Sequence, residues 1–473
     1  MSPLIATLVS AIAILALFVL DRERKVRTSK ALWLPVAWIW IVGSRPISSW
    51  LGLGAMTSSA ADGSPVDASV FALLLFAGII VLVSRKSRTS ACLKAGWPIL
   101  IYFAYCLLSV LWSDFTDISF KRWTKAIGDL VMVLIVITDP MPAAALKRFL
   151  SRVGFILLPA SVLLIKYFGD LGRAFDPWGG LAITGVTTDK NMLGVITFVI
   201  SLGACWRVFA LIRDRGQPNR GRHLLAQCTL LGFGVTLLVM AHSATSGACF
   251  ALGAGLMLAT GLPVIGRRPA AVHALVLVVI LAGGLAMLFG GGTEVVHAMG
   301  RNTDFTGRTA IWKTVIPMNP NPAVGAGFES FWLGPRLEKM WRAFPVFRPN
   351  EAHNGYIEVY LNLGWVGVGL IALVLMNGYW RAIAAFRRDP AIGGLMLAYV
   401  AAAAIYSVTE AGFRMLDPIW IFLLLAVVAA GRVSSFVGSK TQRAVRSASN
   451  RTPRPAPSDS QALVPSGGTV EAF

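Results

Sequence analysis

Long apolar stretches recur along the whole chain, and they constrain its fold more than any other feature. A helix needs about 20 mostly apolar residues to cross a bilayer, and it satisfies its backbone groups within its own segment. Only 14% of the residues are charged, which argues against an ordinary soluble domain. We therefore expect an all-α fold, a polytopic transmembrane helix bundle with about 12–13 spans. The thirteen candidate stretches are 4–20, 31–51, 68–83, 96–112, 120–137, 149–168, 192–212, 224–241, 248–265, 271–290, 356–380, 392–408 and 418–430.

Basic residues are concentrated in alternate connections, and this alternation predicts the orientation of the chain. One set of connections, taken with the C-terminal tail, holds 28 of the 43 lysines and arginines, and the opposite set holds 15. Cytoplasmic loops carry the excess of basic residues, so we expect the N-terminus outside and the C-terminus inside. The net charge of +20 is mostly this signal. It does not indicate a nucleic-acid partner, because the basic residues are scattered over short loops and one tail.

One long hydrophilic insertion interrupts the apolar pattern, and the alternation of basic residues places it outside. Within it we expect a helix with Arg308 in its first turn, ended by Pro317, and a second short helix over 335–344. The C-terminal tail is rich in Ser, Pro and Arg and is predicted to be disordered. The expected organisation is ten transmembrane helices in 1–290, the insertion in 291–352, three transmembrane helices in 353–433 and the cytoplasmic tail in 434–473.

His353 stands where the insertion enters the next apolar stretch. An imidazole titrates near neutral pH, which suits a group that takes a proton from a hydroxyl. Gly364 follows eleven residues later, almost three helical turns, so both would share one helix face and the glycine would let a neighbouring helix come close. A histidine at a membrane rim is usually just an interfacial residue. Here it has Glu351, Asn354 and Glu358 beside it and a basic insertion before it, which favours a functional role.

Asp189 precedes the seventh apolar stretch and is expected to cap that helix, with Lys190 and Asn191 exposed at its N-terminus. Free N–H groups and a partial positive charge at a helix N-terminus suit a phosphate, and Lys190 adds a full charge. The alternative is that Asp189 only caps the helix and Lys190 is exposed to solvent without binding a phosphate. The aromatic residues of the insertion also leave two interpretations open, since such rings stack on sugars or, more often, pack helices against a bundle.

Several common site patterns are absent from the sequence. No cysteine falls in a predicted outer loop, and no CxxC, HExxH or Asp-x-Asp pattern indicates a metal centre. No Gly-Lys-Ser loop indicates nucleotide hydrolysis. We therefore expect neither a cofactor nor a metal. Nucleotides are scarce outside a cell, so a substrate there must bring its own leaving group, as a lipid-linked pyrophosphate glycan does. Arg308 and its neighbours would neutralise the departing diphosphate.

Five segments of the chain, in their order and spacing, resemble one known family. They are Trp112-Ser113-Asp114, Thr188-Asp189-Lys190-Asn191-Met192-Leu193-Gly194, the hydroxyl-rich turn before Gly247, Gly307-Arg308-Thr309-Ala310-Ile311-Trp312 and His353-Asn354-Gly355-Tyr356. With them the chain resembles the O-antigen ligases and polysaccharide polymerases of bacterial inner membranes, especially the exopolysaccharide polymerases. The family's ligases carry Arg-x3-Leu and His-x10-Gly in their large periplasmic loop. His353 and Gly364 match the second pattern, but Arg308 is followed by Trp312 where the first has leucine.

The resemblance implies a metal-independent, inverting transfer of a glycan from undecaprenyl pyrophosphate at the periplasmic face of the inner membrane. It also implies polysaccharide export and chain-length proteins as partners. We expect His353 and Arg308 to be catalytic, as the proton acceptor and the partner of the diphosphate. The expected substrate-binding residues are Arg173, Lys190, Asn191, Lys313, Asn354, Tyr356, Glu410 and Arg414.

Three functions fit these observations. The first is a polymerase that joins lipid-linked repeat units, and the second is a ligase that moves a glycan onto lipid A core or another acceptor. The third is a flippase or other transporter of lipid-linked oligosaccharides. A transporter usually has polar groups or broken helices at the membrane midplane, whereas the polar groups here collect at the predicted outer rim. Resemblance to the exopolysaccharide branch favours the polymerase over the ligase.

The predicted orientation can be tested by cysteine labelling in intact cells. We predict that a cysteine introduced at Asn319, within the insertion, reacts with a membrane-impermeant reagent added outside. A cysteine introduced at Arg215, in a basic connection, should react only after the membrane is permeabilised. The reverse pattern would place the insertion in the cytoplasm and overturn the orientation.

Overall fold

The fold is taken from a computed structural model. It describes residues 2–23, 26–53, 63–175, 179–289 and 306–449, without the side chains of 286–289, 306–307 and 434–449. Contacts divide the chain into two units, Met1–Ser434 and Ser435–Phe473. The arrangement described below is that of the first unit. Expectations about the opening of the insertion and the end of the tail, 290–305 and 450–473, lie outside the described residues.

The described part of the chain is built almost entirely of helices, which confirms the all-α prediction. The sheet found there is one short antiparallel pair, β1 (Arg173–Phe175) with β2 (Leu181–Ile183). The long apolar helices are α1 (Pro3–Leu20), α4 (Pro65–Ser84), α8 (Pro142–Tyr167), α10 (Lys190–Arg213), α11 (Arg220–Ala241), α12 (Ala244–Gly261) and α18 (Gly355–Phe386). The other helices outside the insertion are η1 (Lys30–Leu32), α2 (Trp33–Val42), α3 (Ile47–Trp50), α5 (Lys86–Ala95), α6 (Trp97–Leu108), η2 (Ser109–Trp112), α7 (Thr116–Ile137), α9 (Gly169–Gly172), α13 (Pro263–Gly266), α14 (Pro269–Phe289), α19 (Pro390–Tyr406) and α20 (Pro418–Ser449).

Each of the thirteen predicted stretches falls on helix, but fewer helices are long and apolar enough to cross a membrane. Seven qualify within the described ranges, and the bent pair of α5 with α6 and η2, with 87° between its two parts, raises the number to eight. Over the residues whose side chains are described, the apolar parts of η1 with α2, of α14, of α19 and of α20 are shorter: Lys30–Val42, Pro269–Leu285, Pro390–Tyr406 and Pro418–Val433. Helix α7 is long enough to cross a membrane, but Lys121, Arg122 and Lys125 near its start keep it from being apolar over that length. The structure thus confirms a polytopic bundle but not the predicted count of about 12–13 spans.

The centre of the bundle is formed by α10, which packs against α8, α11, α12 and α19. In the most apolar stretch of α10, 83% of the residues are buried inside the bundle, whereas only 11% and 17% are buried in the corresponding stretches of α1 and α4. Large apolar side chains such as Leu8, Leu73 and Phe76 are therefore exposed. Lipid tails are as apolar as leucine, so these outer helices are suited to face a bilayer.

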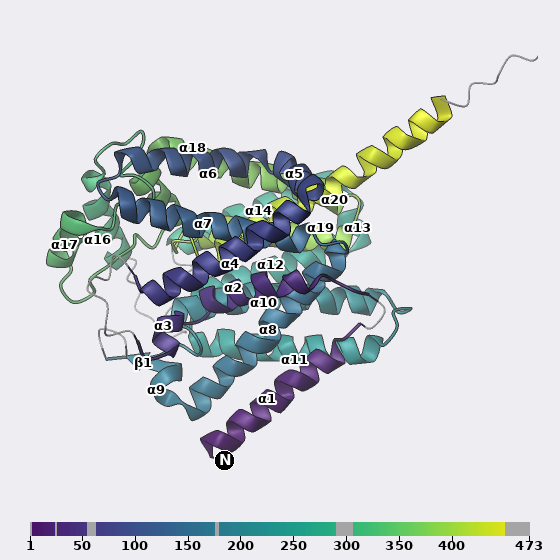
Figure 1. The fold of residues 1–473 in the computed structure, drawn as a ribbon, viewed down its shortest axis with the longest axis horizontal. Coiled ribbons are helices and arrows are strands. Elements are labelled where there is room, and N and C mark those ends of the chain that lie inside the picture. The colour runs from purple at the N-terminus through teal and green to yellow at the C-terminus, as the bar shows by residue number, and fades with distance from the viewer. Residues whose placement is uncertain (1, 24–25, 54–62, 176–178, 290–305, 450–473) are drawn as a thin grey trace, which may run out of the picture. The chain divides into compact units, whose positions relative to one another are not determined.

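The two ends of the helices carry different segments (Figure 1). The α5 and α13 connections lie at one end, on the right in this view, and the helices of the insertion lie at the other. This arrangement agrees with the alternation of basic residues along the sequence. Which end faces the cytoplasm stays a prediction.

The described part of the insertion forms a small core of its own. It contains α16 (Thr306–Val315), η3 (Ile316–Met318) and α17 (Gly334–Ala343), so both predicted helices are confirmed. Phe331 and Trp332 are buried in this core together with Ile311, Val315 and Met340. For these two rings the packing interpretation is correct, because buried rings are not available for stacking on sugars.

Helix α18 is broken at Gly364, whose φ of 64° and ψ of −166° are not helical. His353 precedes the helix altogether, because α18 begins at Gly355. The expectation that His353 and Gly364 share one helix face is therefore wrong. A regular helical period cannot be extended through a glycine that takes a left-handed conformation.

The break in α18 is where the insertion attaches to the bundle. The backbone N–H of Trp365 donates to the carbonyl of Pro322 at 2.9 Å, and that of Ala326 donates to the carbonyl of Leu361 at 3.0 Å. A Cβ atom placed on Gly364 would lie 2.2 Å from the backbone of Ala323. The glycine thus permits the close approach of the insertion, where a neighbouring helix was expected.

Helix α20 continues to Ser449, past the position at which the C-terminal tail was predicted to begin. Residues 434–449 are therefore helical where disorder was expected. Disorder of the remaining tail is a prediction about residues outside the described ranges.

We predict that Gly364→Ala destabilises the attachment of the insertion. The new methyl group would meet the backbone of Ala323 and the left-handed φ would be strained, so the free energy of unfolding should fall by more than about 1 kcal/mol. The control is Gly369→Ala, in the same helix, where a Cβ meets nothing within 4 Å. Denaturant unfolding in detergent micelles should separate the two variants, and equal stabilities would contradict the proposed attachment.

Candidate active site

His353 lies between the insertion and α18 in a left-handed backbone conformation, with φ at 47°. Residues other than glycine seldom adopt this conformation, and it persists where the surroundings enforce it. The next residue, Asn354, caps α18 by accepting hydrogen bonds from the backbone N–H groups of Tyr356 and Ile357, both at 3.0 Å. The Asn354 amide also donates to the carbonyl of Val408 at 2.7 Å. The histidine is therefore fixed against the turn that follows α19.

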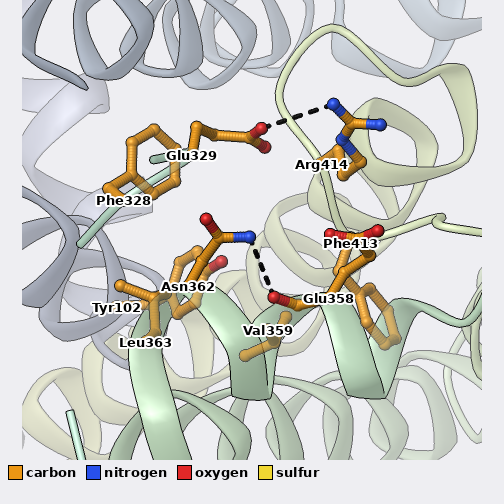
Figure 2. A pocket seen from close by; sticks show the side chains of 9 residues that line it. All are labelled: Tyr102, Phe328, Glu329, Glu358, Val359, Asn362, Leu363, Phe413 and Arg414. Carbon is orange, nitrogen blue, oxygen red and sulfur yellow. Dashed lines mark hydrogen bonds and ion pairs between the residues drawn. The ribbon is translucent and has the colours of Figure 1, made fainter. Parts of the chain in front are cut away.

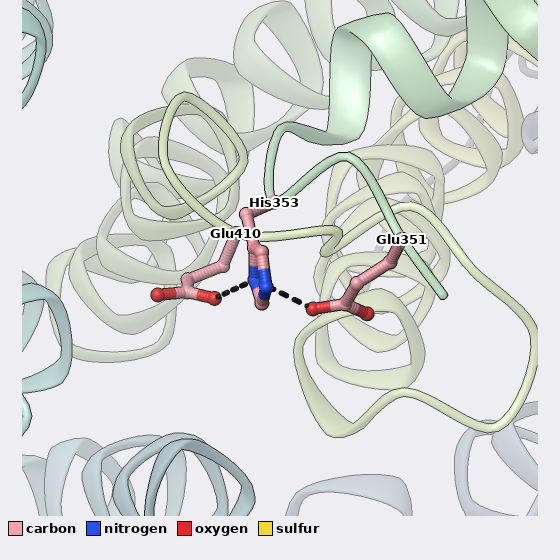
Figure 3. A group of neighbouring side chains, drawn as sticks. All are labelled: Glu351, His353 and Glu410. Atoms are coloured by element: carbon pink, nitrogen blue, oxygen red, sulfur yellow. Dashed lines mark hydrogen bonds and ion pairs between the residues drawn. The ribbon is translucent and has the colours of Figure 1, made fainter. Parts of the chain in front are cut away.

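Two carboxylates flank the His353 ring (Figure 3). Its Nδ1 lies 2.8 Å from Oε1 of Glu351 and 3.3 Å from Oε2 of Glu410. Glu351 belongs to the insertion and Glu410 to the turn after α19. The Glu410 side chain is 7% exposed, whereas those of His353 and Glu351 are 17% and 25% exposed. Glu410 thus forms the inner wall of the site, and the other two reach its open side.

Arg308 reaches the same cluster from the first turn of α16. Its Nη2 lies 2.8 Å from Oε1 of Glu410, and its Nη1 donates to the carbonyl of Thr409. The Arg308 side chain is 27% exposed. The two residues predicted to be catalytic, Arg308 and His353, are therefore joined through one carboxylate.

Arg414 completes the arrangement on the other side. Its Nη1 lies 3.0 Å from Oε2 of Glu351, and its Nη2 lies 3.6 Å from Oε2 of the buried Glu329. Each carboxylate beside the histidine is thus shared with an arginine. The members of this His353 cluster are Arg308, Glu351, His353, Glu410 and Arg414.

The charges in the cluster set its protonation. Burial lowers the pKa of His353, but the hydrogen bonds and charges of Glu351 and Glu410 outweigh burial and raise the pKa to about 10. Burial likewise raises the pKa of Glu351, but His353 and Arg414 outweigh it and lower the pKa to about 2. At neutral pH the ring of the ligand-free site is therefore an imidazolium. A proton acceptor must then include the carboxylates as well as the ring.

The N-terminus of α10 lies near the cluster. Oδ1 of Asp189 accepts from the backbone N–H groups of Asn191 and Met192 at 2.9 Å each, which confirms the predicted cap. The charges of Asp189 and Glu351 are close enough to interact. Lys190 and Asn191 thus belong to the same rim as the His353 cluster.

The turn that carries Glu410 is also tied to the start of α12. The hydroxyls of Thr245 and Thr409 lie 3.1 Å apart, and a Cβ on Gly194 would lie 2.5 Å from the hydroxyl of Ser246. The starts of α10 and α12 and the turn after α19 therefore form one packed rim, although they are far apart in the sequence.

The other predicted site residues fall into two groups. The hydroxyl of Tyr356 donates to the carbonyl of Ala404 at 3.0 Å, so it supports the site from within the bundle. Arg173 on β1 donates to the carbonyl of Ile165 at 3.1 Å, and Lys313 is exposed on α16. Within the described ranges, no hydrogen bond or ion pair joins Arg173 or Lys313 to the His353 cluster. A role for these two in substrate binding stays a prediction.

Two indole groups fix the peptide units on both sides of Ala352, the residue before His353. Nε1 of Trp312 donates to the Ala352 carbonyl at 2.7 Å. The Ala352 N–H donates to the carboxylate of Glu358, which also accepts from Nε1 of Trp332 at 2.9 Å. Trp312 thus links α16, which carries Arg308, to the strained histidine. The departure from the Arg-x3-Leu pattern supplies a hydrogen-bond donor that leucine lacks.

A small polar cavity lies next to the cluster (Figure 2). Glu329, Glu358, Asn362 and Arg414 line it together with five apolar or aromatic side chains. Its volume of about 10 Å³ holds roughly one water molecule. It is too small for a sugar, so the open approach to His353 lies on the exposed side of Arg308 and Glu351.

Glu351, His353 and Glu410 are also the described residues that could hold a metal ion, since their ligand atoms lie within 4.8 Å of one another. A divalent ion there would have to displace the Nδ1 proton and compete with Arg308 and Arg414 for the two carboxylates. The arrangement therefore fits charge compensation by arginine better than chelation. Metal independence stays a prediction.

Two residues of this region were not among the predicted site residues. Glu351 lies two positions before His353, so its nearness to the histidine was visible in the sequence, but its pairing with Arg414 was not. Glu329 lies in the middle of the insertion with a left-handed φ of 52°, and no sequence pattern indicates it. Long-range ion pairs of this kind leave no local signal.

Comparisons with known proteins give one family match and one similar protein. Residues 231–372 match a family model described as "O-Antigen ligase", a range that includes Arg308, Trp312 and His353. The chain is also similar to the "Exopolysaccharide production protein ExoQ" of Rhizobium meliloti (strain 1021). The two are 26% identical over 330 residues, which cover 66% of this chain and 71% of the relative.

We predict that Trp312→Phe lowers the free energy of unfolding by about 1–3 kcal/mol, because the buried Ala352 carbonyl loses its donor while the ring remains. Trp341→Phe in the same insertion is the control, since that side chain is 37% exposed, and it should change stability by less than about 0.5 kcal/mol. Denaturant unfolding in detergent measures both. Equal effects of the two substitutions would contradict the link between α16 and His353.

Proposed function

We propose that the chain, which matches an O-antigen ligase family model over residues 231–372, is a polysaccharide polymerase. It transfers a glycan from an undecaprenyl-pyrophosphate-linked donor to a lipid-linked acceptor repeat unit at the periplasmic face of the inner membrane. The similar protein of Rhizobium meliloti is by name an exopolysaccharide production protein, which supports the polymerase. Export and chain-length proteins are the partners that this role requires.

The observation that carries the proposal is the joining of Arg308 and His353 through Glu410 at the rim of the bundle. Arg308 is partly exposed and is held by one carboxylate and one carbonyl. A diphosphate offers oxygens in the same geometry with more charge, so it can replace Glu410 on the planar guanidinium. Lys190 at the N-terminus of α10 adds a second cation at the same rim.

The reaction needs a proton acceptor and a place for the leaving electron pair. The acceptor hydroxyl forms a bond to the anomeric carbon on the face opposite the diphosphate. The bond from that carbon to the diphosphate breaks, and its electron pair leaves on the diphosphate, where Arg308 stabilises the charge.

The proton of the hydroxyl passes to the Glu410–His353 pair. Glu351, Glu410 and protonated His353 carry two negative charges and one positive charge, so this group can accept one proton. When the diphosphate takes Arg308 away from Glu410, that carboxylate loses its guanidinium partner and can accept a hydrogen bond from the acceptor hydroxyl. Donor binding would thereby prepare the acceptor of the proton.

A ligase is the second candidate, and the description of the matching family model favours it. Both reactions need the same diphosphate site and the same proton acceptor. They differ in the acceptor, which is another lipid-linked repeat in one case and lipid A core or a different acceptor in the other.

We predict that Arg308→Lys severely impairs polymer synthesis. Lysine keeps the charge but loses the fork that matches two phosphate oxygens. Arg342→Lys is the matched control, because Arg342 lies in the same insertion with its side chain 78% exposed. Polymer yield should be measured at equal protein levels in the membrane. Normal yield from Arg308→Lys would exclude a bidentate role for Arg308.

A deletion strain distinguishes the polymerase from the ligase. Loss of a polymerase should abolish high-molecular-weight polysaccharide and leave single repeats on the lipid carrier, as separated by gel electrophoresis of extracted carriers. Long chains left on the carrier, with none on the final acceptor, would identify a ligase and overturn the proposal.

A further inference from the structure

A second and larger cavity lies between the end of η2 and the insertion. Its volume is about 200 Å³, and it shares no residue with the His353 cluster. It is lined by Trp112, Asp114, Pro320, Asn321, Val324 and the adjoining small residues Gly325 and Ala326. The segments that form it meet only in the folded chain.

The ring of Trp112 is held in place within this cavity. Its Nε1 donates to the carbonyl of Val324 at 3.3 Å, and its ring centroid lies 6.0 Å from that of Tyr105. The side chain is partly exposed, so part of its surface remains accessible in the cavity. A fixed aromatic surface suits the apolar C–H face of a sugar ring.

A hydrogen-bond acceptor and a hydrogen-bond donor lie beside the ring of Trp112. One oxygen of Asp114 is 2.7 Å from Nη2 of Arg336, and the Asp114 side chain is 58% exposed, which leaves its other oxygen able to accept a hydrogen bond. Oδ1 of Asn321 accepts from the N–H of Ala323 at 2.9 Å, so its amide NH₂ is oriented as a donor. A carboxylate and an amide together can bind neighbouring hydroxyls.

We propose that this cavity binds one sugar residue of the glycan, with the ring of Trp112 against its apolar face and Asp114 and Asn321 on its hydroxyls. This inference rests on the proposed function of the His353 cluster. The cavity is too small for a lipid chain or a folded partner, and its mixture of a ring, an acceptor and a donor is the chemistry of a carbohydrate site.

The attachment of the insertion gives the position of this sugar along the glycan. The cavity wall at Ala326 is bonded to Leu361 in α18. From Asn354, next to His353, to Leu361 the helix rises by roughly 10 Å. The bound sugar is therefore not the reacting one but lies further along the chain, where it aligns the glycan with the reacting site.

The test measures binding separately from transfer. The probe is a set of lipid-free oligosaccharides cut from the polysaccharide that the native strain secretes, titrated calorimetrically into the full-length protein in detergent. We expect Asp114→Asn and Trp112→Ala to weaken binding about tenfold, a loss of roughly 1.4 kcal/mol. The Trp341→Ala variant, at an exposed tryptophan of the insertion that does not line the cavity, should bind the oligosaccharides as the unchanged protein does. Asp114→Asn keeps the shape of the site, so its result stands even if Trp112→Ala folds poorly.

The outcomes separate this proposal from the function of the cluster. Oligosaccharide binding that Asp114→Asn weakens supports the subsite even if the purified protein transfers no glycan. Oligosaccharide binding that is absent, or unchanged in Asp114→Asn, overturns it. A phospholipid headgroup in the cavity is the competing occupant. If the substitutions change only the binding of phospholipid vesicles, the cavity is a headgroup site and the proposal is wrong.

Discussion

The site depends on balanced charge around one strained histidine. His353 is held in a left-handed conformation between Glu351 and Glu410, and each carboxylate is compensated by an arginine from a different segment. A buried carboxylate without a partner is costly, so removal of either arginine would disturb the ring as well as the substrate. The cluster therefore joins the insertion to the turn after α19, and the same contacts that hold the two segments together also set the protonation of the site.

The break in α18 makes this joining possible. The first part of α18 runs from the cap at Asn354 to Leu363, and the insertion pairs with its end through backbone hydrogen bonds next to Gly364. The insertion is thus attached at both ends of one short helical segment: at Ala352 by the two indole groups and at Gly364 by the backbone. Arg308 reaches Glu410 because α16 is packed within this frame. A rigid frame of this kind keeps charged groups in place without reorganisation during a reaction.

Much of this fold was visible in the sequence, and the limits have physical causes. Apolar length predicted the long helices, local capping chemistry predicted the cap at Asp189, and prolines predicted the bounds of the two helices of the insertion, because these signals lie within a few residues. The prediction that His353 and Gly364 share a helix face failed, because a regular helical period assumes an unbroken helix and α18 is broken at Gly364. The resemblance and the local setting singled out His353 and Arg308, but the pairing of Glu351 with Arg414, the role of Glu329 and the indole of Trp312 arise from contacts between distant segments.

The central claim is that this cluster transfers a glycan with arginine in place of a metal. The most direct measurement uses the purified protein in EDTA with a defined undecaprenyl-pyrophosphate-linked repeat unit and detects both polymer and released undecaprenyl pyrophosphate. The account predicts both products from the unchanged protein and a rate about 10²–10⁴ lower from His353→Ala at equal protein concentration. Failure in EDTA with recovery on addition of magnesium or manganese, or an undiminished rate from His353→Ala, would contradict it.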